Sequence, residues 1–90
     1  MRRELPNGEV AVYPNPSTTG RLTLHIAGAT TPTAQATLFN ALGQCVLTQP
    51  VRLRGGAAEQ PLSVRYLPKG LYTLRVQVGH IFVARKVVLE

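Results

Sequence analysis

Hydrophobic and polar residues alternate with a period of two along most of this chain. Between Arg21 and Ala27 leucine or isoleucine fills every second position, and a similar alternation recurs from Tyr72 to Val78. Successive side chains of a β-strand point to opposite faces, so each stretch predicts a strand with one buried face. Turn residues recur about every eight to twelve positions, and no stretch has the spacing of an amphipathic helix. The pattern predicts an all-β protein, a seven-stranded antiparallel Ig-like β-sandwich.

Two of the expected strands have features that bear on their place in a sheet. The run from Gln44 to Arg54 contains Pro50, which indicates a strand that bends or lies at a sheet edge. The last run is apolar on both faces apart from Arg85 and Lys86, which is typical of a central strand or of an edge that another segment covers. The expected strands are Val10–Tyr13, Arg21–Ala27, Ala34–Phe39, Gln44–Arg54, Leu62–Arg65, Tyr72–Val78 and Ile81–Leu89.

The turns between these strands have recognisable chemistry. Asn40 to Gly43 has Asn first and Gly where a left-handed conformation is needed, which predicts a type I turn with a G1 bulge. Pro68 and Gly70 mark a tight turn. Gly79-His80 fits the tip of a two-residue type II′ hairpin between the last two strands.

Composition indicates one domain with a core of its own. The 90 residues are 44% hydrophobic and 16% charged, which is enough apolar material for a small core without disulfides or a metal. Residues 1–9 are interpreted as a linker remnant and residues 10–90 as the domain. The chain has no apolar run long enough to span a membrane and no signal peptide is recognised. Its only cysteine, Cys45, has apolar neighbours and is expected to be a small buried hydrophobe.

Candidate catalytic and metal-binding groups are sparse. There are four glutamates and no aspartate, so sites that depend on Asp are excluded. His25 and His80 have no carboxylate or cysteine near them in sequence, which argues against a metal site. Ser17 and Ser63 lack the context of a catalytic triad. We therefore expect no enzymatic activity, no metal and no cofactor.

The net charge of +6 raises the alternative of a basic binding face. Tyr72 and Phe39 are expected to be buried, so an exposed aromatic set for stacking bases is missing and nucleic-acid binding is disfavoured. Weak nonspecific binding to acidic polysaccharide or lipopolysaccharide is the milder form of the same idea. The arginines that would contribute are spread over several strands: Arg21, Arg52, Arg54, Arg65, Arg75 and Arg85.

Four short motifs follow one another along the chain in a distinctive order. They are Tyr13-Pro14-Asn15-Pro16 with Gly20, Leu38 to Gln44, Leu67 to Leu74, and Arg85 to Glu90 at the end. In this order the chain resembles the C-terminal sorting domain of the type IX (Por) secretion system, type A, from about Val10 to Glu90. It departs from the family's common pattern at two positions, with Asn40 in place of Asp and Gln44 in place of Arg.

The resemblance implies a non-catalytic signal at the C-terminus of a secreted cargo protein. Such a domain directs its N-terminally fused cargo through the periplasm and across the outer membrane by the type IX machinery. A surface sortase then removes it and often joins the cargo to a lipopolysaccharide anchor. The runner-up is a stand-alone sandwich for interaction or adhesion at a cell surface. The resemblance points to these recognition positions: Pro14, Asn15, Pro16, Gly20, Asn40, Gly43, Pro68, Gly70, Tyr72, Lys86, Val88, Leu89 and Glu90.

Within these positions, the last five residues are expected to contain most of the sorting information. Lys86 to Glu90 combine a cation, an apolar run and a terminal carboxylate in a short distance. A terminal strand can be engaged without unthreading a loop, and its free end is expected to pair with a receptor by strand addition.

Overall fold

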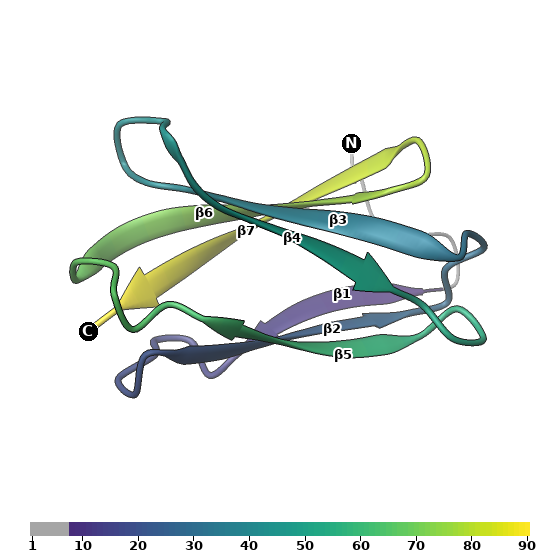
Figure 1. The fold of residues 1–90 in the computed structure, drawn as a ribbon, viewed down its shortest axis with the longest axis horizontal. Coiled ribbons are helices and arrows are strands. Elements are labelled where there is room, and N and C mark those ends of the chain that lie inside the picture. Colours follow the sequence, from purple (N-terminus) through teal and green to yellow (C-terminus); the bar gives the residue numbers. More distant parts are fainter. Residues whose placement is uncertain (1–7) are drawn as a thin grey trace.

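A computed structural model describes residues 8–90 and shows two packed antiparallel sheets (Figure 1). The three-stranded sheet has the order β1-β2-β5 and the four-stranded sheet the order β4-β3-β6-β7. The predicted all-β sandwich with seven strands is therefore confirmed. Residues 1–7, most of the predicted linker, lie outside the described residues. The strands are β1 (Glu9–Tyr13), β2 (Arg21–Ala27), β3 (Thr33–Phe39), β4 (Cys45–Arg52), β5 (Ala58–Ser63), β6 (Gly70–Val78) and β7 (Ile81–Leu89).

The core lies between the two sheets and is formed by the inward-facing positions of the alternation. Leu24, Ile26, Leu38 and Val76 have no exposed surface, and Val87 of the last strand is equally buried. Burying an aliphatic side chain of this size contributes about 1.5–3 kcal/mol relative to leaving it in water. The period-two pattern in the sequence therefore identified the core-facing side chains of β2 and β6 correctly.

The hairpin of β6 and β7 is confirmed in its register and in the position of its turn. Val78 pairs with Ile81, which leaves Gly79-His80 as the two-residue tip. Gly79 has a φ of +63°, the left-handed conformation that the predicted turn requires of its first residue.

β5 differs from its predicted bounds. It spans Ala58–Ser63 and ends before Val64, whereas the alternation predicted a strand over Leu62 to Arg65. Its start was missed because Pro61 weakens the strand signal, and an edge strand such as β5 tolerates proline. Its end is set by its partner, because β2 begins only at Arg21. Val64 is still buried beyond the end of β5.

Two burial predictions were wrong. Cys45 is exposed, and Phe39 is half-buried on the outer face of the four-stranded sheet. Both follow from the pleat, because Leu38 occupies the inward position and its neighbour Phe39 must point outward. The register shift after Leu38 then places Cys45 opposite Phe39. The thiol Sγ lies 3.4 Å from the hydroxyl of Thr48 instead of in the core.

β4 and β7 are the two edge strands of the four-stranded sheet, which settles the positions that the sequence left open for them. β4, which contains Pro50, lies at one edge of its sheet as predicted. β7 lies at the other edge of the sheet. Of the two places predicted for a strand that is apolar on both faces, it therefore has the second, an edge that another segment covers. Part of the covering segment is the connection between β1 and β2, because Ser17 forms a parallel bridge with Leu89.

Candidate functional site

Three connections and the end of the chain lie together at one end of the sandwich. Consecutive strands run in opposite directions, so β1, β3, β5 and β7 all finish at the same end (Figure 1). We call this region the motif end, formed by residues 14–20, 40–44, 64–69 and 86–90. It brings together the motifs that are separated in the sequence. The start of β1 lies at the opposite end, in a molecule whose longest extent is 34 Å.

The side chain of Asn15 pairs with the outer edge of β7. Its Nδ2 donates to the carbonyl of Lys86 at 2.7 Å, and its Oδ1 accepts from the amide of Val88 at 3.0 Å. A primary amide has the donor and acceptor of a peptide group, so Asn15 extends the sheet by one peptide unit. The flanking Pro14 and Pro16 have no amide hydrogen to offer, and both proline peptide bonds are cis.

Ser17 continues the same edge through its backbone. Its amide donates to the carbonyl of Val88 at 2.8 Å, and its carbonyl accepts from the amide of Glu90 at 2.8 Å. The hydroxyl of Ser17 donates to the carbonyl of Arg21 at 2.8 Å, and the residue is only 1% exposed. We refer to Asn15 and Ser17 with the residues they hold, 86–90, as the C-terminal clamp.

The clamp overturns the expectation that the free end of β7 is open to strand addition. The carbonyl of Lys86, both backbone groups of Val88 and the amide of Glu90 are already bonded to residues 15 and 17. A partner strand would have to displace the loop first. Of the side chains in this segment, Lys86 and Glu90 are exposed, whereas Val87 and Leu89 point into the core.

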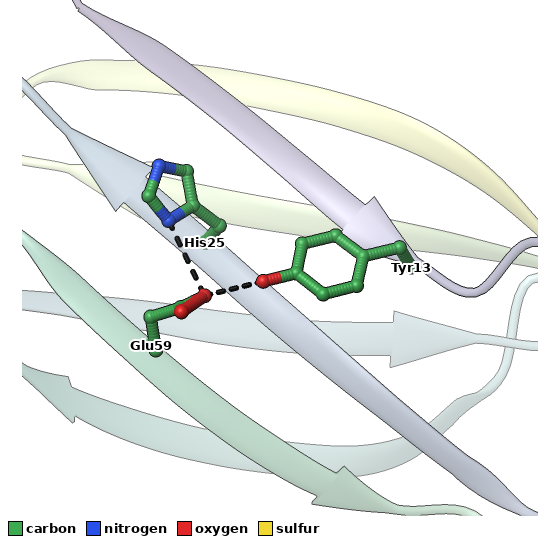
Figure 2. A network of polar contacts seen from close by, with 3 residues as sticks. All are labelled: Tyr13, His25 and Glu59. Carbon is green, nitrogen blue, oxygen red and sulfur yellow. Dashed lines mark hydrogen bonds and ion pairs between the residues drawn. The ribbon is translucent and has the colours of Figure 1, made fainter.

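A polar cluster on the outer face of the three-stranded sheet includes Tyr13, the last residue before the β1–β2 connection (Figure 2). The Tyr13 hydroxyl donates to Oε2 of Glu59, and Nδ1 of His25 lies 3.4 Å from the same oxygen. Glu59 lies directly opposite His25 in the β2–β5 register. Strand pairing therefore brings these two residues together although they are far apart in the sequence. The hydrogen bond from Tyr13 lowers the pKa of Glu59, and the same bond raises the pKa of Tyr13.

Buried tyrosine and tight packing fix the neighbouring connection. The hydroxyl of Tyr72 donates to the carbonyl of Pro68 at 2.6 Å, which ties the turn before β6 to the core. Gly20 has a φ of +76°, and a Cβ there would lie 2.9 Å from Cα of Arg65. Of the predicted positions, Pro68, Tyr72 and Gly20 thus set the shape of the motif end.

The turn between β3 and β4 has the predicted conformation, and it brings the two departures from the family pattern together. The amide of Gly43 donates to the carbonyl of Asn40 at 3.0 Å, and Gly43 has a φ of +81°. Oδ1 of Asn40 accepts from the amides of Leu42 and Gln44, and its Nδ2 donates to Oε1 of Gln44 at 2.8 Å. A neutral amide pair therefore occupies the two positions at which the chain departs from the pattern that it resembles.

Other candidate chemistry is dispersed. Residues 8–90 contain no group of three or more His, Cys, Asp and Glu side chains arranged to hold a metal ion. The same residues contain no helix that is long and apolar enough to cross a membrane. The arginines do not form one basic face, because Arg21 points out from the three-stranded sheet and Arg75 from the four-stranded sheet.

Comparison with known families identifies the domain. The sequence model described as "Secretion system C-terminal sorting domain" matches residues 11–90. The chain belongs to this family. No curated protein matches it. The sorting domain is a signal for type IX secretion, which exports cargo across the outer membrane to the cell surface or the medium.

Proposed function

We propose that the type IX machinery reads this sorting domain at its motif end, through the outward side chains that the C-terminal clamp presents. The observation that supports this is the pairing of Asn15 and Ser17 with the last five residues. The clamp fixes the backbone of residues 86–90 from both sides, since β6 holds the other edge. A fixed backbone presents the side chains of Lys86 and Glu90 in one arrangement, which lowers the entropy lost on binding.

The position of the cargo is consistent with this assignment. Cargo joined upstream of Val10 enters at the start of β1, at the end of the sandwich opposite the motif end (Figure 1). The surface that is read and the junction that is cut are therefore well separated. We infer that the domain passes through the periplasm without a catalytic role and that a surface sortase removes it at this junction. In the same scheme the cargo is joined to lipopolysaccharide.

The test is export of a reporter with an N-terminal export signal, fused upstream of this domain in a type IX host. We expect Lys86→Ala to leave the reporter in the periplasm, because the exposed ammonium group is removed while the core is untouched. Arg52→Ala is the matched control: it removes an exposed cation from β4, the far edge of the same sheet. Equal export of both variants and the parent would contradict the proposal.

Deletion of residues 86–90 is a weaker form of this test. It removes the buried side chains of Val87 and Leu89 and leaves the polar groups of Asn15 and Ser17 without partners. Loss of two such aliphatic side chains costs several kcal/mol, so the truncated domain is expected to unfold. The Lys86 substitution separates recognition from stability and is therefore decisive.

A further inference from the structure

The two sheets differ in charge. The strands of the four-stranded sheet contain no carboxylate, whereas β1 and β5 of the other sheet contain Glu9 and Glu59. The outer face of the four-stranded sheet has three charged side chains on its strands, all of them cationic: Arg52, Arg75 and Lys86. A surface of this kind favours an anionic partner.

Arg75 lies at the centre of this face between two aromatic rings. Its guanidinium carbon is 5.0 Å from the ring centroid of Phe39 on β3 and 5.4 Å from that of Phe82 on β7. Phe82 is 46% exposed and Leu71 is 50% exposed, so apolar surface surrounds the cation. A shallow hollow beside it is lined in part by Phe39, Leu71, Arg75 and Ala84.

Arg75 is exposed, so its N–H groups remain available for hydrogen bonds. A guanidinium between rings keeps its N–H groups in its own plane, where they can donate in pairs to a carboxylate. Within residues 8–90, Arg75 forms no ion pair. Its guanidinium group makes cation–π contacts with the rings of Phe39 and Phe82. Arginine with aromatic and aliphatic neighbours is also the composition that recurs at the centres of protein interfaces.

We propose that the outer face of the four-stranded sheet docks a protein partner that places a carboxylate, flanked by apolar side chains, on Arg75. A nucleic acid fits less well because Arg75 occupies the ring faces on which a base would stack. An anionic lipid surface is drawn to clustered cations, whereas here one central cation is set among apolar groups. The hollow borders the motif end at Asn40, Ala41 and Gly43. The proposal rests on Arg75 and its two rings, and it does not depend on the proposed reading of the motif end.

The test uses the whole isotope-labelled chain and a defined probe, a five-residue capped peptide that alternates leucine and glutamate. We expect binding with a dissociation constant of about 1 mM. The amide chemical shifts of Phe39, Arg75 and Phe82 should change. Arg75→Gln should weaken binding by about fivefold, as expected for loss of one exposed charged contact. Arg52→Gln on the same face, away from the rings, should leave it unchanged. Phe82→Ser is a second variant that removes one ring without touching the charge.

Each possible result decides the proposal. Equal binding of a leucine-lysine peptide would show that charge is not read and would overturn it. Shift changes on this face with phosphatidylglycerol vesicles or with an oligothymidylate, but not with the acidic peptide, would replace the protein partner by a lipid or a nucleic acid. Absence of any shift change with the acidic peptide would also overturn it. Dispersed amide spectra of the variants confirm that the fold is intact in every arm.

Discussion

An asparagine side chain can take the place of a peptide group at a sheet edge, and Asn15 does so at the end of this molecule. It satisfies one acceptor and one donor of β7 that would otherwise face water. The residues on either side of it are prolines, which cannot donate to β7 themselves. The amide side chain thus supplies the donor that the backbone of this loop lacks.

The clamp predicts a graded effect of substitutions at Asn15. Asn15→Ala removes both hydrogen bonds and is expected to destabilise the domain by about 1 kcal/mol, because the exposed groups left behind are solvated by water. Asn15→Asp keeps the acceptor for the amide of Val88 but places a carboxylate against the carbonyl of Lys86. Because two acceptor oxygens would then face each other, its cost should be at least as large as that of Asn15→Ala. Urea unfolding measures both, and faster exchange of the Val88 amide in Asn15→Ala is the local signature.

A contrast of two glycines tests the packing of the motif end. Gly20→Ala introduces a Cβ 2.9 Å from Cα of Arg65 at a positive φ, whereas Gly55→Ala meets nothing within 4 Å at a similar φ of +60°. The conformational cost of about 1 kcal/mol is common to both substitutions. Gly20→Ala should therefore lose distinctly more stability in urea unfolding. Equal losses would show that the contact with Arg65 relaxes freely.

Single residues show where sequence reasoning succeeds and where it stops. Gly43 and Gly79 were predicted because turn chemistry is local and written in adjacent residues. The role of Ser17 was missed, since its partners Val88 and Glu90 are separated from it by most of the chain. A lone serine after Pro-Asn-Pro gives no signal of a buried edge contact.

At the scale of elements, the alternation predicted strands well but left their neighbours open. β2 and β7 have the predicted bounds, and β7 lies at a covered edge, one of the two places that its apolar faces left open. Whether an apolar strand is central or covered at an edge depends on a loop elsewhere in the sequence. The pairing of strands within a sheet depends on long-range register, such as His25 on β2 with Glu59 on β5, which period-two patterns do not encode.

The Tyr13–Glu59–His25 cluster links three strands and predicts a pH dependence. Because the folded-state pKa of Glu59 is lowered, the unfolded chain binds its proton first as the pH falls. The contribution is present at neutral pH and is lost below the ordinary glutamate pKa, about 4.3, as the pH passes through the folded value. Because the folded-state pKa of Tyr13 is raised, the stability that its hydroxyl contributes is lost as the pH rises beyond about 10.

Comparison with Glu59→Gln isolates this effect. Glutamine still accepts the hydrogen bond from Tyr13 but does not titrate, so the difference in unfolding free energy between wild type and Glu59→Gln should shrink in acid. Tyr13 and Glu59 are exposed and His25 is half-buried, so the difference is expected to be small and to fall with added salt. A difference that stays constant between neutral pH and pH about 3 would show that the pKa of Glu59 is not lowered in the folded state.

At the scale of the whole molecule, seven antiparallel strands place the start of β1 and the end of β7 at opposite ends. An odd number of alternating strands has this consequence whatever the side chains are. In the proposed function, cargo joined before β1 extends from the end of the sandwich opposite the motif end (Figure 1). The same parity puts the β6–β7 tip, Gly79-His80, on the cargo side.

This polarity predicts that the place of an added domain, more than its size, decides export. A small folded tag joined after Glu90 covers the exposed side chains of Lys86 and Glu90 and is expected to trap the reporter in the periplasm. The same tag inserted between Gly79 and His80 lies at the opposite end and should leave most of the export intact, because exposed turn tips tolerate insertions. The measurement is the ratio of surface and medium reporter to periplasmic reporter, with thermal unfolding showing that both fusions are folded. If the tag at the β6–β7 tip blocked export as completely as the C-terminal tag, size alone would explain the loss, and the motif end would have no special part in recognition.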